Sequence, residues 1–121
     1  ANADSKIKTP GNLFYNGYWA TRALLETVEK LKTTNNRAII KELEQLKIPA
    51  ATRMQHHDAF MNPATHQLQQ TIYLATANLA SSSPDELFKI LSNTDPTQVG
   101  DKDADGKCKL EPLESTPVYE P

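Results

Sequence analysis

The chain has 121 residues, 38% of them hydrophobic, which leaves room for one domain at most. A formal net charge of −2 at pH 7 supplies no basic stripe for nucleic acid and no cationic face for an anionic membrane. No apolar run approaches the roughly 18 residues that a membrane-spanning helix needs, and the first residues do not resemble a signal peptide. These properties exclude several classes of protein and select none.

The first predicted element is an amphipathic helix over residues 12–32. It follows a lead-in, residues 1–11, that is expected to be disordered, because Thr9-Pro10-Gly11-Asn12 is rich in residues that break regular structure. Ala1-Asn2-Ala3 resembles a cloning scar. Apolar or small residues then recur at steps of three and four, the spacing of one helix face: Leu13, Gly17, Ala20, Leu24, Val28 and Leu31.

A second helix is predicted over residues 37–46, with Ile39, Ile40, Leu43 and Leu46 on one face. A polar joint precedes it, in which either Asn35 or Asn36 can cap the first turn. Ile48-Pro49 is expected to stop the helix, because proline disfavours the helical conformation of the residue before it. Two helices with so short a linker predict a helical hairpin.

The middle of the chain predicts extended structure. Over residues 67–77 apolar and polar residues alternate, apart from a break at Gln70, and this pattern is typical of a strand. Asn62-Pro63-Ala64-Thr65 has the composition of a turn, so residues 53–60 are the expected partner strand of a β-hairpin.

The last predicted element is a short helix that begins at Ser83-Pro84-Asp85-Glu86. Serine caps, proline occupies the first helical position and Glu86 completes a capping box. The apolar face of this helix would be Leu87, Ile90 and Leu91. Nothing after Ser92 is periodic, and residues 96–121 are expected to form an irregular tail.

These elements do not suffice for an independent core. A two-stranded sheet is marginal in water, and a strand as apolar as residues 71–77 needs neighbours on both edges, of which the chain supplies at most one. The chain is therefore expected to belong to a larger fold or to complete itself by forming oligomers.

Two groups of residues suggest metal binding, and neither meets the requirements. Asp101, Asp103 and Asp105 before Gly106 resemble the start of a calcium loop, but the twelfth position is Pro112 instead of glutamate, which favours a solvated acidic turn. The second group has residue types that bind zinc: His56, His57, Asp58 and His66. Neighbours on a strand point to opposite faces, so His56 and His57 cannot both bind one metal from a regular strand. The group is expected to hydrogen-bond around the turn instead. No metal and no cofactor are expected.

Catalytic signals are also lacking. The one cysteine, Cys108, has no histidine near it in sequence, and no nucleophile, P-loop or dinucleotide motif occurs, so the chain is not expected to be an enzyme. Aromatic residues gather at the start of the first helix, where rings can either wall a small-molecule cleft or pack a core or domain interface: Phe14, Tyr15, Tyr18 and Trp19.

Several segments occur in an order and spacing similar to those of one known family. They are residues 14–20 (FYNGYWA), 37–46, 58–67, 71–75, 85–91 and 108–110. In this order they resemble the C-terminal part of type I periplasmic solute-binding proteins of the branched-chain amino-acid and amide ABC-transporter family. The resemblance covers roughly residues 13–110.

The resemblance implies an α/β fold in which residues 12–95 are the C-terminal part of the periplasmic-binding domain. This partial lobe would consist of the helical hairpin, the β-hairpin with a hinge strand and the short C-terminal helix. The family implies transport: the complete protein, in the periplasm, binds an amino acid, an amide or urea and delivers it to an inner-membrane ABC permease.

The main ligand-binding residues of the family lie mostly upstream, so this part is not expected to bind ligand alone. Phe14 and Tyr15 are the residues that the resemblance assigns to ligand binding. Nucleic acid is not an expected partner. The alternative, from a different class, is a small stand-alone interaction protein that forms a homo-oligomer through its helical hairpin.

Overall fold

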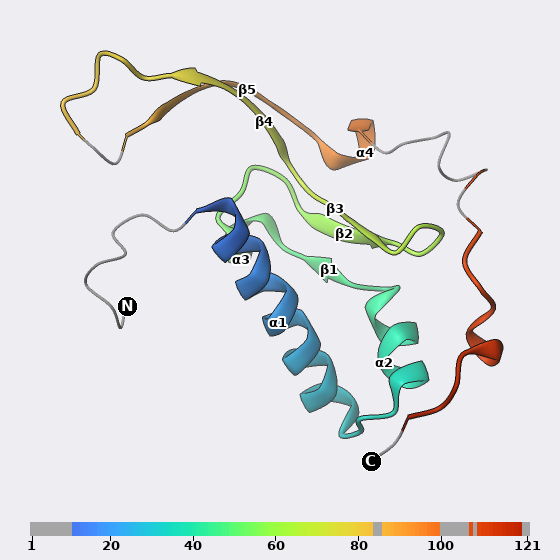
Figure 1. Cartoon of the computed structure of the whole chain (residues 1–121). Coiled ribbons are helices and arrows are strands. Elements are labelled where there is room, and N and C mark those ends of the chain that lie inside the picture. Colours follow the sequence, from blue (N-terminus) through green and yellow to red (C-terminus); the bar gives the residue numbers. More distant parts are fainter. Residues whose placement is uncertain (1–10, 84–85, 100–106, 108, 120–121) are drawn as a thin grey trace.

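The computed structural model describes residues 11–83, 86–99, 107 and 109–119. They form a mixed fold of helices and antiparallel sheets, with a body and a protruding ribbon (Figure 1). The body contains the helices α1 (Asn12–Leu31), α2 (Asn36–Leu43) and α3 (Ala50–Arg53), and a sheet of β1 (Lys47–Ile48), β2 (Ala59–Asn62) and β3 (Gln67–Gln69). The ribbon pairs β4 (Ile72–Ala77) with β5 (Phe88–Thr94), and α4 (Pro96–Val99) and the 3-10 turn η1 (Leu113–Ser115) follow.

The predicted helical hairpin is confirmed. α1 ends because Lys32 adopts a left-handed conformation (φ 53°), which turns the chain while its N–H still bonds to the carbonyl of Val28. α2 then begins with its predicted cap, since the Asn35 side chain accepts a hydrogen bond of 3.1 Å from the N–H of Ala38. An ion pair between Lys30 and Glu42 joins the two helices.

The second helix ends three residues before the end of the predicted span of 37–46. It ends at Leu43 instead of at Ile48-Pro49, because the N–H groups of Gln45 and Leu46 bond to carbonyls three residues back, as in a tight turn. The chain then enters β1, whose Ile48 faces Ala59 of β2.

The predicted turn over residues 62–65 is confirmed, because β2 and β3 form an antiparallel hairpin around it. The predicted partner strand over residues 53–60 is wrong for most of its length. Pro49 precedes the single turn of α3, and the Asp58 carboxylate accepts a 2.7 Å hydrogen bond from the N–H of Ala50, so residues 50–58 fold into a compact loop. Only Ala59 and Phe60 of the predicted segment are extended.

The single strand predicted over residues 67–77 is two strands that belong to different sheets. They separate at Gln70, the position where the alternation of the sequence fails. The Gln70 side chain accepts a hydrogen bond from Arg53, and Thr71 is 97% buried, with 3% of its surface exposed. These inward contacts bend the chain from the body into the ribbon.

The helix predicted after Ser83 is wrong: Leu87 lies in no helix, and Ile90 and Leu91 lie in strand β5. Its proposed start, Pro84-Asp85, lies outside the described residues. β5 pairs antiparallel with β4, from Ile72 opposite Thr94 to Ala77 opposite Phe88. An apolar strand edge offered by β4 outweighs a local capping signal, because pairing satisfies a whole row of backbone groups. As expected, β4 has one strand neighbour within the described part.

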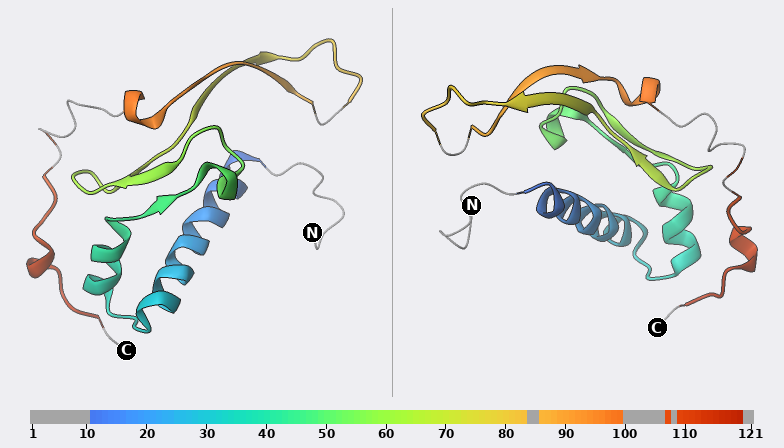
Figure 2. Two further views of the ribbon diagram at one scale, coloured as in Figure 1. Left: turned by 180° about the vertical axis from the view of Figure 1, so that it is seen from behind. Right: turned by 45° about the horizontal axis from the view of Figure 1, so that its top comes forward.

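The ribbon projects from the body. Figures 1 and 2 show the three-stranded sheet between the helical hairpin and the ribbon, whose far end extends beyond the other helices and strands. Its register shifts between Leu74 and Ala75, which adds twist near the middle. Most side chains of both strands are exposed.

The tail, expected to be irregular, is anchored to α2. Arg37 donates hydrogen bonds to the carbonyls of Glu114 and Thr116, at 2.7 and 2.5 Å. Asn36 donates to the carbonyl of Pro117 and accepts from the N–H of Tyr119. Residues 1–10, the acidic stretch 101–106 and Cys108 lie outside the described residues, so the expectations for them are not addressed.

The core is small. Among the described residues four hydrophobic side chains are buried, Trp19, Ala23, Ile48 and Ala59, with Tyr15, Leu46 and Leu68 packed around them. This core lies between α1 and the three-stranded sheet. Many large apolar side chains stay exposed elsewhere, above all on the outer face of α1 and on the ribbon.

The cap of α2 offers a test of this local description. Replacing Asn35→Ala removes the acceptor for the Ala38 N–H and should lower the free energy of unfolding by about 1 kcal/mol. Thr34→Ala, at the exposed neighbouring position, is the matched control and should have little effect. Urea unfolding followed by circular dichroism measures both. Equal stability of the two variants would contradict the capping role.

Candidate functional site

The aromatic residues at the start of α1 divide between two faces of the helix. Phe14 and Tyr18 are exposed on the outer face, whereas Trp19 is buried against the sheet and Tyr15 is half-buried. Phe14 and Tyr15, the two residues assigned to ligand binding, therefore lie in different environments. Their role in binding a ligand stays a prediction.

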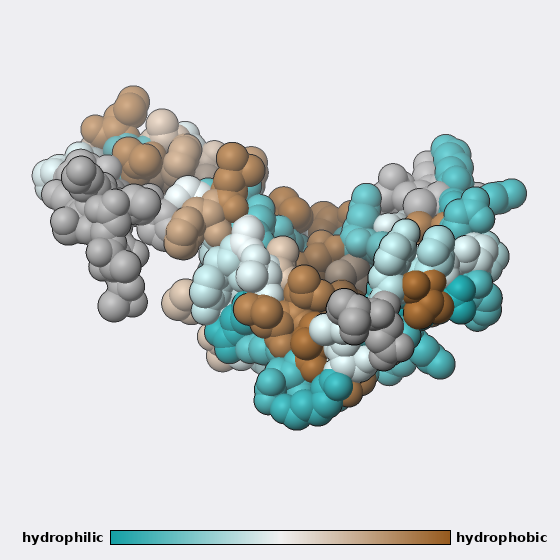
Figure 3. All heavy atoms as spheres, turned by 60° about the horizontal axis from the view of Figure 1, so that its bottom comes forward, coloured by the Kyte–Doolittle hydropathy of each residue, from teal (hydrophilic) through white to brown (hydrophobic). Residues whose placement is uncertain are grey.

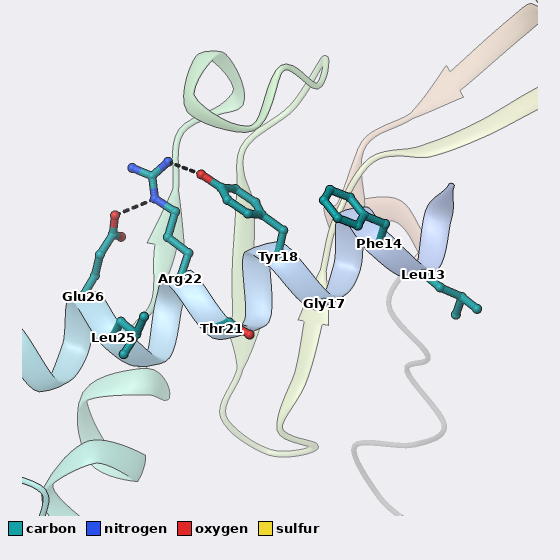
Figure 4. A pocket seen from close by; sticks show the side chains of 8 residues that line it. All are labelled: Leu13, Phe14, Gly17, Tyr18, Thr21, Arg22, Leu25 and Glu26. Carbon is teal, nitrogen blue, oxygen red and sulfur yellow. Dashed lines mark hydrogen bonds and ion pairs between the residues drawn. The ribbon is translucent and has the colours of Figure 1, made fainter. Parts of the chain in front are cut away.

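Phe14 lines a shallow groove of about 560 Å³ that runs along the outer face of α1 (Figure 4). Gly17 lines this groove, and the space beside it is open, since a Cβ atom there would meet nothing within 4 Å. The groove walls are largely apolar, and 58% of the Phe14 surface is exposed. Helix α1 supplies every residue that lines it: Leu13, Phe14, Gly17, Tyr18, Thr21, Arg22, Leu25 and Glu26.

The charges beside this groove are paired with each other. Figure 4 shows Arg22 between Glu26, whose carboxylate accepts a 2.6 Å hydrogen bond, and the Tyr18 hydroxyl at 3.3 Å. The hydrogen bond to Glu26, followed by that to Tyr18, raises the pKa of Arg22 above its ordinary value. The guanidinium of Arg22 is therefore already matched by a carboxylate, and the rest of the groove presents apolar surface.

On the inner side of α1, Tyr15 belongs to a cluster around Arg53, which has 1% of its surface exposed. The Arg53 Nε donates to the Tyr15 hydroxyl (3.2 Å) and Nη2 donates to Oε1 of Gln70 (2.6 Å). The Tyr15 hydroxyl in turn donates to the Arg53 carbonyl at 2.9 Å. The guanidinium also lies 5.2 Å from the centre of the Tyr15 ring and 5.4 Å from that of Trp19. Such cation–π contacts favour a positive charge at this place.

Two hollows of about 440 Å³ each border the Arg53 cluster. One lies between the helical hairpin and the three-stranded sheet, with Trp19 and Gln70 on its wall. The other is a more open groove near the start of α1, with Tyr15, Gln55 and Tyr73 on its wall. Arg53 borders both. Nothing in the sequence distinguishes Arg53 from Arg22 and Arg37, which are only partly buried, and this is why sequence reasoning missed it.

The histidines connect the body to the ribbon and do not form a metal site. His56 approaches the Tyr73 hydroxyl of β4 at 3.1 Å through both its N–H and Nδ1. Nε2 of His57 lies 2.9 Å from Oδ1 of Asn93 in β5, and Nδ1 lies 3.3 Å from Oδ2 of Asp95. His66 points elsewhere, toward Glu44 at 2.9 Å. Among the described residues no group of three metal-ligating side chains lies close enough together to hold a metal ion. The predicted hydrogen-bonding role around the turn over residues 62–65 is wrong for His56 and His57, whose contacts are with the ribbon.

Asp95 supplies a pH-dependent prediction. Hydrogen bonds from the Thr97 hydroxyl (2.6 Å) and N–H (2.8 Å), with a smaller contribution from His57, lower the pKa of Asp95 below its ordinary value. The folded state therefore binds this proton less tightly than the unfolded state. The stabilisation is present above the unfolded pKa of about 3.9 and is lost as the pH falls through the lower folded value.

Thr97→Val removes the largest cause of this shift, so the pKa of Asp95 should rise toward its ordinary value. NMR titration of the Asp95 carboxyl measures the pKa directly. Urea unfolding should show that the variant is less stable than the unmodified chain at pH 7, and that this difference shrinks as the pH falls to 2. Thr76→Val on the exposed part of β4 is the control. An unchanged Asp95 pKa in Thr97→Val would contradict this assignment.

No family model, curated protein or solved structure matches the chain. The similarity to type I periplasmic solute-binding proteins therefore stays a prediction that depends on the sequence segments quoted above. Among the described residues, no helix has the length and apolar character that crossing a membrane requires.

Proposed function

We propose that this chain is the C-terminal part of a type I periplasmic solute-binding protein of the branched-chain amino-acid and amide ABC-transporter family. The complete protein binds an amino acid, an amide or urea and delivers it to an inner-membrane permease. In this proposal the present part completes one lobe and supplies a strand to the hinge. It has no catalytic role and needs no cofactor.

The observation that carries the proposal is the large apolar surface that the described residues leave uncovered. On α1, Leu13 is 89% exposed and Phe14 and Leu25 are exposed beside it. On the ribbon, large apolar side chains are exposed from both strands: Ile72, Leu74, Phe88, Ile90 and Leu91. Figure 3 shows hydrophobic residues at the surface both on the protruding ribbon and in the middle of the body. Contiguous apolar patches of this kind mark surfaces that another protein part covers.

The order of elements also supports the proposal. The segments that resemble the family coincide with regular structure: residues 14–20 lie in α1, residues 58–67 contain β2 and the turn, and residues 71–75 lead into β4. One departure is the segment 85–91, of which residues 88–91 form a strand where the expected lobe has a short helix.

The alternative function is a small stand-alone protein that assembles through its helical hairpin. The exposed face of α1 favours it, since a second copy could cover that face. The contacts of α2 argue against this alternative. Arg37 and Asn36 hydrogen-bond to residues 114–119 of the same chain, which therefore cover a side of α2 that a second copy would need. Sedimentation of the complete gene product distinguishes the two: the proposal predicts a monomer, and the alternative a dimer or larger assembly.

Binding by the complete gene product tests the proposal. A thermal-shift screen against amino acids, amides and urea should find a ligand that raises the melting temperature, because a ligand at 100 times its Kd stabilises the folded state by about 2.7 kcal/mol. In that protein Phe14→Ala should weaken binding roughly tenfold, which corresponds to about 1.4 kcal/mol. Thr21→Ala, further along the same groove, is the control.

Two outcomes would count against this account. If no compound of these three classes stabilises the complete protein, the proposed transport function is wrong. If a ligand binds and Phe14→Ala binds it as tightly as the unmodified protein does, the family assignment survives and the role of Phe14 is wrong.

A further inference from the structure

The hollow between the helical hairpin and the three-stranded sheet has the features of a ligand cavity. Its volume of about 440 Å³ is within the range of small-molecule sites, roughly 300–1,000 Å³. Most of its wall is aliphatic, with contributions from α1, α2 and the sheet, including Leu24, Leu43, Met61 and Leu68. Arg53, Gln70 and Asn16 are its polar groups. An apolar wall with few polar groups is typical of sites that bind a mostly apolar molecule in a fixed orientation.

Arg53 brings a positive charge to this cavity without a negative partner. Within the described part of the chain it forms none of the ion pairs, and its hydrogen-bond acceptors, the Tyr15 hydroxyl and the Gln70 amide, are neutral. Its Nη1 is buried and has no hydrogen-bond partner among these residues. Burying a charge is costly unless it is paired and hydrogen-bonded, so this guanidinium lacks the anion that would complete its surroundings.

The contacts of the guanidinium indicate which of the two hollows receives the anion. Nε bonds to Tyr15, which borders the more open hollow near the start of α1 and not the cavity. Nη2 bonds to Gln70, which borders the cavity and not the groove. A carboxylate binds arginine best through two parallel hydrogen bonds. Nη1 has no partner among the described residues and Nη2 has one hydrogen left after its bond to Gln70, so these two nitrogens can supply such a pair.

We propose that this cavity binds a small carboxylic acid with an apolar body. The carboxylate pairs with Nη1 and Nη2 of Arg53, and the hydrocarbon part lies between Trp19 and the aliphatic wall of the cavity. The site is on the inner side of α1, whereas Phe14 lies on the outer side. It is therefore a second site, and it does not depend on the proposed transport function.

Trp19 is the only tryptophan of the chain and borders the cavity, so its fluorescence reports on occupancy. Circular dichroism first checks that the 121-residue chain is folded. The chain is then titrated with hexanoate, octanoate and phenylpropionate, each below its micelle concentration, and with acetate as a reference acid that lacks an apolar body. The neutral amides of the three longer acids are titrated in parallel. We expect a saturable change of Trp19 emission with the acids and binding at least roughly tenfold weaker with the amides, since a charged pair is replaced by a neutral one. Calorimetry checks that the change in fluorescence reports binding.

The variant Arg53→Gln should bind the acids and the amides about equally, because it loses the charge and keeps a polar side chain. Arg22→Gln is the matched control: Arg22 also lies over the Trp19 ring, at 5.0 Å, but on the exposed side of α1, and its loss should leave the preference for acids unchanged. If Arg53→Gln does not fold, the comparison of acids with amides on the unmodified chain decides alone.

Three results would overturn the proposal. The first is equal affinity for an acid and its amide, which removes the role of the charge. The second is acetate binding as tightly as octanoate, which removes the role of the apolar cavity. The third is the absence of binding by calorimetry at millimolar concentrations of all three acids.

Discussion

The guanidinium of Arg53 lies where three parts of the body meet. It stacks against Tyr15 and Trp19 of α1, and it bonds to Gln70 at the junction of β3 and β4. Arg53 itself ends α3, so one side chain connects the first helix, the loop between β1 and β2 and the start of the ribbon. Removing a buried group with several partners is costly because each partner is left unsatisfied. The position of α1 on the sheet therefore depends on this contact.

The ribbon depends on a second set of polar contacts next to the first. Thr71 is buried beside Gln70 and accepts a hydrogen bond from the N–H of His57. His57 also reaches Asn93 and Asp95, so the loop after α3 holds both strands of the ribbon at their body end. Most described side chains of the two ribbon strands are exposed. A two-stranded ribbon is marginal alone in water, which is the physical reason to expect a further neighbour for it.

Local signals predicted much of the body. The apolar spacing of residues 12–32 predicts a helix, Asn35 is a good N-cap residue, and Asn62-Pro63 favours a turn. The structure contains all three features. The break at Gln70 was visible in the alternation of the sequence, although its cause, a hydrogen bond to Arg53, was not. The strand β5 could not be predicted, because the local capping pattern favours a helix there. The strand forms through pairing with β4, a separate segment, and a local pattern does not show such a pairing.

The candidate sites were harder to predict than the fold. Phe14 and Tyr15 are neighbours in sequence but lie on different sides of one helix, since adjacent residues of a helix are about 100° apart. Arg53 looks like any other arginine in the sequence, and its burial follows only from the packing of α1 on the sheet. The exposed apolar surfaces of α1 and the ribbon are what connect these observations to a larger protein.

The mass of the native gene product, detected with an antibody raised against this chain, tests that connection most directly. The account predicts a single band in the periplasmic fraction at roughly two to three times the 13.5 kDa of this chain, the size of a two-lobed binding protein. A band at 13.5 kDa would contradict it, because the exposed helix face and ribbon would then have to be covered by further copies of the same small protein.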